Sequence, residues 1–146
     1  MTAPGQPAFG GKCDMEKDMR ILLAYDDSNA AKAAVQVTEE HAKAFAGYVY
    51  VVRSMSADLD HRQLEKARRE LEEACAVFQG AGIEAEARLL VHGLGPGEDI
   101  VKFAQEQSID QIVIGIKKTS RVGKLLLGSN AQYIILNAPC PVTTVR

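Results

Sequence analysis

The chain has few aromatic residues, few cysteines and little net charge. Of its 146 residues only 5% are aromatic and none is Trp, so stacking surfaces for single-stranded nucleic acid are scarce. The formal net charge of −2 provides no basic field that would attract phosphate polymers. No apolar run is long enough to span a bilayer. The composition therefore predicts a protein without nucleic acid or membrane partners.

The three cysteines, Cys13, Cys75 and Cys140, are far apart, with no CxxC pair and no histidine at ligand spacing. This pattern argues against a zinc site and against a disulfide framework. Reduced thiols predict a cytoplasmic location. Residues 1–18 are rich in Gly and Pro and lack the apolar core of a secretory signal, so we predict a flexible tail or a non-native remnant there. Residues 19–146 then form one domain.

Short apolar runs alternate with amphipathic segments along this domain. The pattern predicts strands over residues 20–25, 48–52, 83–91, 109–114 and 142–145. It predicts helices over residues 30–45, 60–79, 98–107 and 125–136. Regular β-α alternation is typical of the α/β class, here a five-stranded parallel open sheet with helices on both faces and right-handed crossovers.

Helical periodicity also predicts which faces of the two long helices are buried. For the first helix the expected stripe is Ala30, Ala33, Ala34, Val37, His41, Ala44 and Phe45. For the second it is Leu64, Ala67, Leu71, Ala74, Cys75 and Phe78. The charges on the other face of the second helix are balanced, so we interpret that face as solvated.

Open parallel sheets bind ligands beyond the carboxyl ends of their strands, where the strand order reverses. That rule directs attention to the loops after the first and fourth strands. Asp26, Asp27 and Ser28 follow the first strand. A carboxylate there can accept hydrogen bonds from a ribose or base, or hold Mg²⁺ through water. The competing interpretation is that one aspartate only caps the next helix. We predict the ligand role for Asp26 rather than Asp27.

The loop after the fourth strand combines glycines with positive charge. Gly115 lets the backbone leave the strand sharply. Lysines and an arginine follow over residues 117–124, and Gly128, Ser129 and Asn130 stand near a helix start, where backbone N–H groups bind phosphate. Spacing alone favours the plainer alternative, in which Gly128 relieves packing and the lysines are solvated. Neither a Walker A motif nor a GxGxxG turn after the first strand is present.

Three segments carry a family resemblance: ILLAYDDS, IDQIVIG and the terminal GKLLLGSNAQYIILNAPCPVTTVR. On these motifs the chain resembles the universal stress protein family from Met19 to Arg146, and the terminal match, with its APCPV, is the most specific. The resemblance implies a Rossmann-like sheet of the adenine nucleotide alpha hydrolase type. It also implies an ATP-binding or AMP-binding module of stress response or signalling, with Mg²⁺ reaching Asp26 through the nucleotide.

ATP-binding members of that family carry G-x2-G-x9-G-[ST]. Gly115, Gly128 and Ser129 match this spacing, and Lys118 replaces the second glycine. Lysine restricts the backbone through its Cβ but brings a charge that can bind phosphate. The resemblance places Ala24 and Asp26 at the nucleoside and the Ser54 backbone at adenine. Around ribose and phosphates it places Gly115, Lys117, Lys118, Gly128, Ser129 and Asn130.

Family members commonly form homodimers through the last strand, here residues 142–145. The histidines, at positions 41, 61 and 92, form no evident catalytic grouping, so we predict no catalytic residues and at most slow ATP hydrolysis. The alternative is a member that binds no nucleotide because Lys118 closes the phosphate site, and that acts through dimerisation and protein partners. A phospho-receiver domain is disfavoured, because the third strand ends in LLVHG without the acceptor aspartate.

Overall fold

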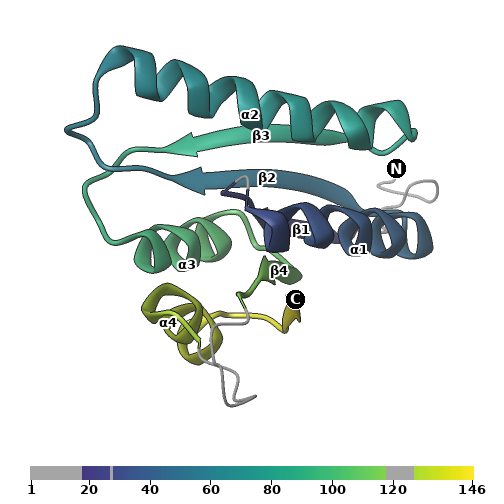
Figure 1. Ribbon diagram of the computed structural model, residues 1–146. Helices are drawn as coiled ribbons and strands as arrows, with labels where there is room; N and C mark the ends of the chain where they lie inside the picture. Colours follow the sequence, from purple (N-terminus) through teal and green to yellow (C-terminus); the bar gives the residue numbers. More distant parts are fainter. Residues whose placement is uncertain (1–17, 27, 118–126) are drawn as a thin grey trace, which may run out of the picture.

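The computed structural model describes residues 18–26, 28–117 and 127–146 (Figure 1). Its strands are β1 (Arg20–Ala24), β2 (Tyr48–Ser54), β3 (Ala85–Leu90), β4 (Gln111–Gly115) and β5 (Val142–Val145). Its helices are α1 (Asn29–Phe45), α2 (His61–Gly80), α3 (Pro96–Glu106) and α4 (Ser129–Asn137). The predicted alternation of strands and helices is confirmed.

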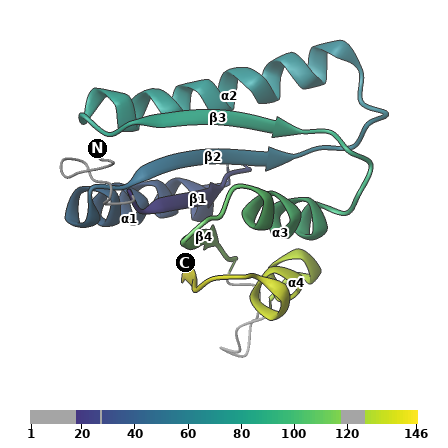
Figure 2. The same cartoon turned by 180° about the vertical axis from the view of Figure 1, so that it is seen from behind.

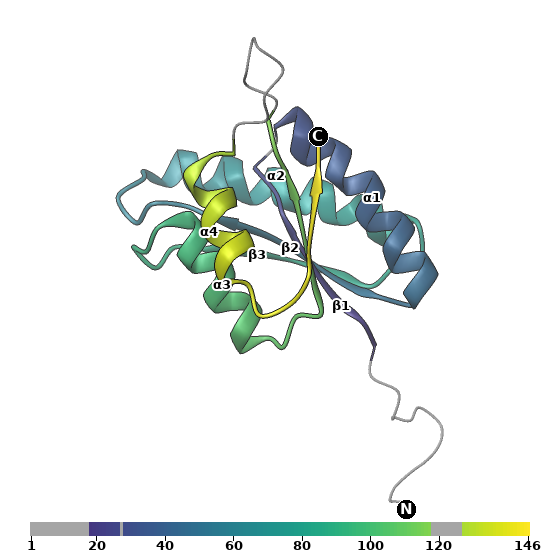
Figure 3. The ribbon, with the colours of Figure 1, turned by 90° about the horizontal axis from the view of Figure 1, so that it is seen from below.

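All the strands of this sheet are parallel, in the order β3-β2-β1-β4-β5. Figures 1 and 2 show β2 and β3 running in the same direction, so their carboxyl ends meet at one edge. Helices α1 and α2 pack on one face, and α3 and α4 pack on the other (Figure 3). The chain crosses from β3 to the far side of β1, so the strand order reverses between β1 and β4.

Strand β1 is buried on both faces. Ile21 and Leu23 contribute to the core beneath α1 and α2, and Leu22 contributes to the core beneath α3 and α4. All three side chains are 0% exposed. A strand covered on both faces needs apolar residues in succession, which is why an uninterrupted apolar run predicts it correctly.

The buried face of α1 differs from the predicted one. Its buried residues are Ala31, Ala34, Thr38 and Ala42, while Phe45 is 58% exposed. Of the predicted stripe, Ala34 alone is fully buried. Small side chains let this helix lie close to the sheet, and the Thr38 hydroxyl donates to the Ala34 oxygen at 2.7 Å. Alanines occur on several sides of α1, so the hydrophobic periodicity could not distinguish the buried face from the faces next to it.

The predicted stripe of α2 is confirmed except at Leu64, which is half-buried. The helix begins with a capping box: Asp60 accepts from the Gln63 N–H at 2.8 Å, and the Gln63 side chain accepts from the Asp60 N–H at 3.1 Å. Its outer face is charged. Among the described residues, no helix combines the length and apolarity needed to cross a bilayer.

Each described helix starts at a residue other than the predicted one, α1 and α2 by a single position and α3 and α4 by more. α3 begins at Pro96 rather than at residue 98, because Gly95 is the N-cap and proline suits the first helical position. α4 begins at Ser129 rather than at Leu125, with Gly128 as an extended N-cap of ψ 163°. The leucines before Gly128 continue the apolar periodicity, which explains the early prediction.

Strand β3 begins at Ala85 rather than at residue 83 and forms one edge of the sheet. Glu86 links two side chains on the face that α3 covers only in part. The Tyr48 hydroxyl donates to Glu86 Oε1 at 2.8 Å, and Arg88 Nε donates to Glu86 Oε2 at 2.5 Å. The Arg88 guanidinium also lies 5.5 Å from the centre of the Phe103 ring. Side-chain contacts therefore join the edge strand β3 to β2 and to α3.

This network makes stability sensitive to alkaline pH through Tyr48. The hydrogen bond to Glu86, followed by burial, raises the pKa of Tyr48 to about 12 from 10.0. Because the folded state holds this proton more tightly, the stability it contributes is complete below pH 10 and is lost as the pH rises toward 12. We expect the stability advantage of the wild type over Tyr48→Phe to shrink across that window in urea unfolding. In a Glu86→Gln background the shrinkage should be smaller, and equal shrinkage would contradict the assignment.

Candidate functional site

A pocket of about 300 Å³ lies at the carboxyl ends of β1 and β4, where the strand order reverses. That volume is at the lower end of the range of about 300–1,000 Å³ typical of small-molecule sites. Its apolar walls include Ala24, Val52, Met55, Ile100, Ile114, Ala131 and Ile134. Its polar side chains include Asp26, Arg53, Ser54 and Asn130. Such a lining suits a flat ring with hydrogen-bonding edges.

Several residues singled out from the sequence meet at this pocket, although they come from different elements. The pocket is lined by Ala24, Asp26, Ser54, Gly115 and Asn130. Lys117 is exposed just beyond β4 and does not line it, and neither do Gly128 and Ser129. Lys118 falls outside the described residues. The pocket therefore gathers the residues expected at the nucleoside and adenine, together with Gly115 and Asn130 from the set expected around ribose and phosphates. The roles of all these residues as ligands stay predictions.

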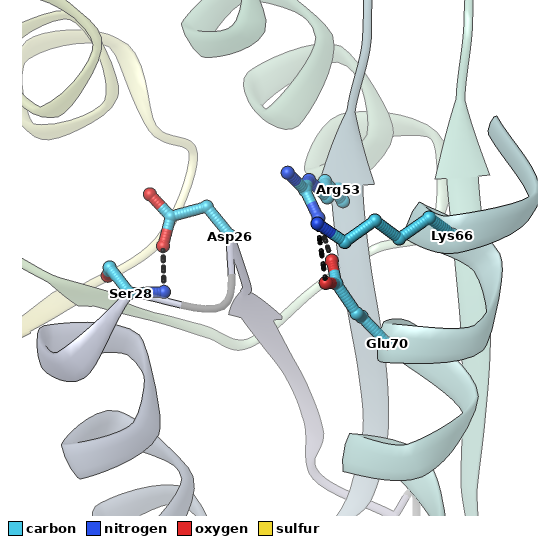
Figure 4. A network of polar contacts seen from close by, with 5 residues as sticks. All are labelled: Asp26, Ser28, Arg53, Lys66 and Glu70. Atoms are coloured by element: carbon cyan, nitrogen blue, oxygen red, sulfur yellow. Dashed lines mark hydrogen bonds and ion pairs between the residues drawn. The ribbon is translucent and has the colours of Figure 1, made fainter. Parts of the chain in front are cut away.

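Asp26, an exposed residue just after β1 (Figure 4), lines this pocket. Its Oδ1 accepts a hydrogen bond from the Ser28 N–H at 3.1 Å, which orients the carboxylate. The cap of α1 is Ser28, whose hydroxyl oxygen accepts from the Ala31 N–H at 3.1 Å. Asp26 is therefore not the helix cap, and Asp27 is outside the described residues. The Asp26 carboxylate lines the pocket, where a ligand hydroxyl can donate a hydrogen bond to it.

Arg53 is a pocket residue that the sequence pattern did not reveal. It lies near the end of β2, and its Nη1 is 2.8 Å from Glu70 Oε1 on α2 (Figure 4). Lys66 Nζ is 4.0 Å from the other oxygen of Glu70. The apolar run predicts a second strand that ends at residue 52, which leaves Arg53 in a loop. The strand continues to Ser54, and pairing with Glu70 directs the Arg53 guanidinium toward α2.

A buried carboxylate behind Ser54 was also missed. Asp99 of α3 is 1% exposed, and its Oδ2 accepts from the Ser54 hydroxyl at 2.5 Å. His92 Nδ1 is 3.4 Å from Asp99 Oδ1. No spacing in the sequence indicates this cluster, since β2 and α3 meet only in the folded chain. The aspartate stands between serine and histidine, so the histidine cannot take the serine proton directly as a triad requires.

Gly115 lines the pocket and also has a packing role that the sequence did not predict. It is the last residue of β4, paired with Val145, and it has no positive φ that would mark a sharp exit from the strand. A Cβ built on Gly115 would lie 2.4 Å from the carbonyl carbon of Ala30 and 2.7 Å from the Ala31 nitrogen. The glycine is needed because the first turn of α1 packs directly on the end of β4. That contact brings the loop after β1 against the pocket.

Asn130 is held at the pocket by close packing of α3 on α4. Its Oδ1 accepts from the Gly97 N–H at 3.2 Å. A Cβ at Gly97 would lie 3.1 Å from the Tyr133 Cβ, so the two helices approach closely only because residue 97 is glycine. With its oxygen engaged, the Asn130 side chain offers its NH₂ group as a donor.

The residues present do not form a metal site of their own. Within residues 18–26, 28–117 and 127–146, no group of three or more His, Cys, Asp or Glu side chains could hold a metal ion. Mg²⁺ commonly combines one or two carboxylates with phosphate oxygens and water. Asp26 fits the carboxylate part of such a set, so a cation here would rely on a bound ligand for most of its coordination.

The fold and this pocket together define a class: a parallel α/β domain with a pocket at the reversal of strand order, the place where open parallel sheets bind ligands. The universal stress protein family model matches residues 19–146. The chain belongs to this family.

Individual relatives agree with that assignment. A universal stress protein of Thermus aquaticus is 36% identical over 137 residues, covering 86% of this chain and 97% of the relative. A solved universal stress protein from Archaeoglobus fulgidus superposes with a TM-score of 0.79 at 33% identity, covering 89% of this chain and 99% of its own. The structure of the universal stress protein from Archaeoglobus fulgidus in complex with dAMP gives a TM-score of 0.74 at 30% identity, and the match covers 89% of this chain and 98% of that one.

Proposed function

We propose that this chain is a nucleotide-binding stress-response or signalling module that holds the nucleoside of ATP or AMP in the pocket at the ends of β1 and β4. The observation that carries the proposal is the pocket itself, where apolar walls meet Asp26, Ser54 and Asn130 at the reversal of strand order. The complex of an Archaeoglobus fulgidus relative with dAMP supports an adenine nucleotide as the ligand class.

The phosphates would extend from the pocket toward the start of α4. Gly128, the N-cap of α4, has no side chain that could accept from the first N–H groups of the helix, and Asn130 in the first turn lines the pocket. Backbone N–H groups at a helix start favour anions. Lys117, Lys118 and Ser129 would complete this proposed phosphate region, and Asp26 would supply a carboxylate ligand to a Mg²⁺ ion that accompanies the phosphates. In this proposal the chain binds and signals in the cytoplasm, and hydrolysis of ATP is slow at most.

A second copy of the chain would pair along β5. In the described sheet β5 is an edge strand that pairs with β4 alone, and an edge strand is a template for another strand. Ile135 and Leu136 of the neighbouring helix α4 are 40% and 81% exposed. These features also support the alternative function, in which dimerisation and protein partners replace nucleotide binding. Light scattering measures the homodimer directly.

Thermal unfolding with and without nucleotide tests the proposed function. A ligand at about 100 times its Kd stabilises the folded state by about 2.7 kcal/mol, which for a domain of this size raises Tm by roughly 5–10 °C. We expect such a rise with ATP or AMP, and calorimetry should give saturable binding. Titrations with and without Mg²⁺ measure the part that depends on the cation.

The Lys118→Gly variant distinguishes the two functions. If the wild type ignores both ATP and AMP while Lys118→Gly binds them, Lys118 closes the site and the interaction function is correct. If neither protein responds, the nucleotide proposal is wrong for this pocket. Binding by the wild type supports the proposal and shows that a lysine is tolerated in the motif.

A further inference from the structure

The Ser54 hydroxyl has its single proton committed to Asp99. The distance from Ser54 Oγ to Asp99 Oδ2 is 2.5 Å, within the range of about 2.5–2.7 Å typical of a hydroxyl donating to a carboxylate. A serine hydroxyl has one donor and two acceptor lone pairs. With the donor used, Ser54 can offer the pocket only lone pairs.

Asp99 is placed so that this arrangement persists. It lies in α3, is 1% exposed, and has His92 Nδ1 at 3.4 Å on the Oδ1 side. Among the described residues no hydrogen bond reaches that Oδ1. The Ser54 hydroxyl is thus the hydrogen-bond donor that Asp99 has among the described residues, and losing it would leave a buried carboxylate without one, which is costly. Asp99, which does not line the pocket, therefore determines that the Ser54 hydroxyl acts toward the pocket as a hydrogen-bond acceptor.

Strand order places Ser54 at the end of the pocket away from α4. Along the carboxyl edge of the sheet, Ser54 ends β2, Asp26 follows β1, and Gly115 ends β4. Neighbouring strands are about 4.8 Å apart, so β2 and β4 are separated by roughly 10 Å. A nucleotide with its phosphates at the α4 end and its ribose near Asp26 has its base beside Ser54.

From this arrangement we infer that Ser54, oriented by Asp99, selects a base that donates a hydrogen bond: the exocyclic amino group of adenine is accepted and the oxo group of hypoxanthine is rejected. The inference rests on the proposed function and names the group that gives it base selectivity. Ser54 is the specificity-determining residue, and Asp99 is a positioning residue that acts through it. An oxo group at the same place would bring its own lone pair against a lone pair of the Ser54 hydroxyl, and two acceptors repel each other.

Two pairs of nucleotides test this inference: ATP against ITP, and AMP against IMP. Members of a pair differ in the amino or oxo group of the purine and in the proton on the adjoining ring nitrogen. We expect calorimetry on the wild type to show at least about tenfold preference for the amino member, the effect of one hydrogen bond made or opposed. In Ser54→Ala the preference should fall to within about threefold. The exposed neighbour Ser56 provides a matched control, and Ser56→Ala should retain the wild-type ratio.

Asp99→Asn tests the positioning role with little change of shape. An amide NH₂ facing Ser54 donates to its oxygen and frees the hydroxyl proton to point into the pocket, so the preference should fall or reverse while circular dichroism stays native. Equal binding of both members of a pair by the wild type would overturn the inference and leave nucleotide binding intact, as would an unchanged ratio in both Ser54→Ala and Asp99→Asn. Binding of no nucleotide at all would end the proposed function, and the inference with it.

Discussion

Gly115→Ala is expected to destabilise the domain strongly, because the added methyl group has no room against α1. The new Cβ would lie 2.4 Å from the Ala30 carbonyl carbon, 2.5 Å from its oxygen and 2.7 Å from the Ala31 nitrogen. All three neighbours are backbone atoms, which cannot rotate away, so α1 must shift off the sheet. Overpacking typically costs about 1–3 kcal/mol, and we expect about 3 kcal/mol at this position, or a fall of roughly 10 °C in Tm.

Gly80→Ala is the matched control for this substitution. Gly80 ends α2, and a Cβ there has no neighbour within 4 Å. Alanine is favoured over glycine in a helix by up to about 1 kcal/mol, so this variant should be as stable as the wild type or more stable. If Gly115→Ala unfolded within a degree or two of Gly80→Ala, α1 would not lie against β4 as described.

The expected effect on function is greatest for Ala131→Trp. Ala131 lines the pocket from the first turn of α4, and the indole would occupy much of its 300 Å³. If the nucleoside occupies this pocket, we expect affinity for ATP or AMP to fall by at least about 100-fold, which corresponds to about 2.7 kcal/mol. Calorimetry measures the loss directly, and circular dichroism checks that the variant is folded.

Leu136→Trp controls for the added indole. Leu136 lies on the same helix, is 81% exposed and does not line the pocket. This variant should bind nucleotide like the wild type. Equal binding by Ala131→Trp and Leu136→Trp would place the nucleotide elsewhere on the protein and remove the main support for the proposed function.

Much of the sheet could be predicted because central parallel strands leave a strong sequence signal. β1 is covered on both faces, so its residues are apolar in succession. The edge strand β5 also spans the predicted range, because its residues are all β-branched. The face of α1 could not be predicted, because alanine contributes almost no difference in hydrophobicity between one face and the next. Packing against the sheet determined that Ala31 and Ala42 are inside and that Phe45 is outside.

The pocket was predictable in part for the same kind of reason. Asp26 follows β1 and Gly115 ends β4, two strands that are visible in the sequence, and the rule for open parallel sheets brings the ends of those strands together. Arg53 required the exact end of β2, a quantity that hydrophobic patterns define poorly because strand ends are solvated. Asp99 and His92 required the packing of α3 against β2, which no local pattern encodes.

Local chemistry thus accounts for the order of elements, the parallel sheet and the edge where a ligand would bind, since each follows from apolar periodicity and the chirality of the chain. Contacts between distant segments account for the rest. Ser54 and Asp99 are 45 positions apart, and the polarity of the hydroxyl depends on the carboxylate that folding places 2.5 Å from it. Whether a hydroxyl acts toward a ligand as a donor or as an acceptor depends on the groups that surround it in the folded chain. Those groups come together only when the helices pack on the sheet.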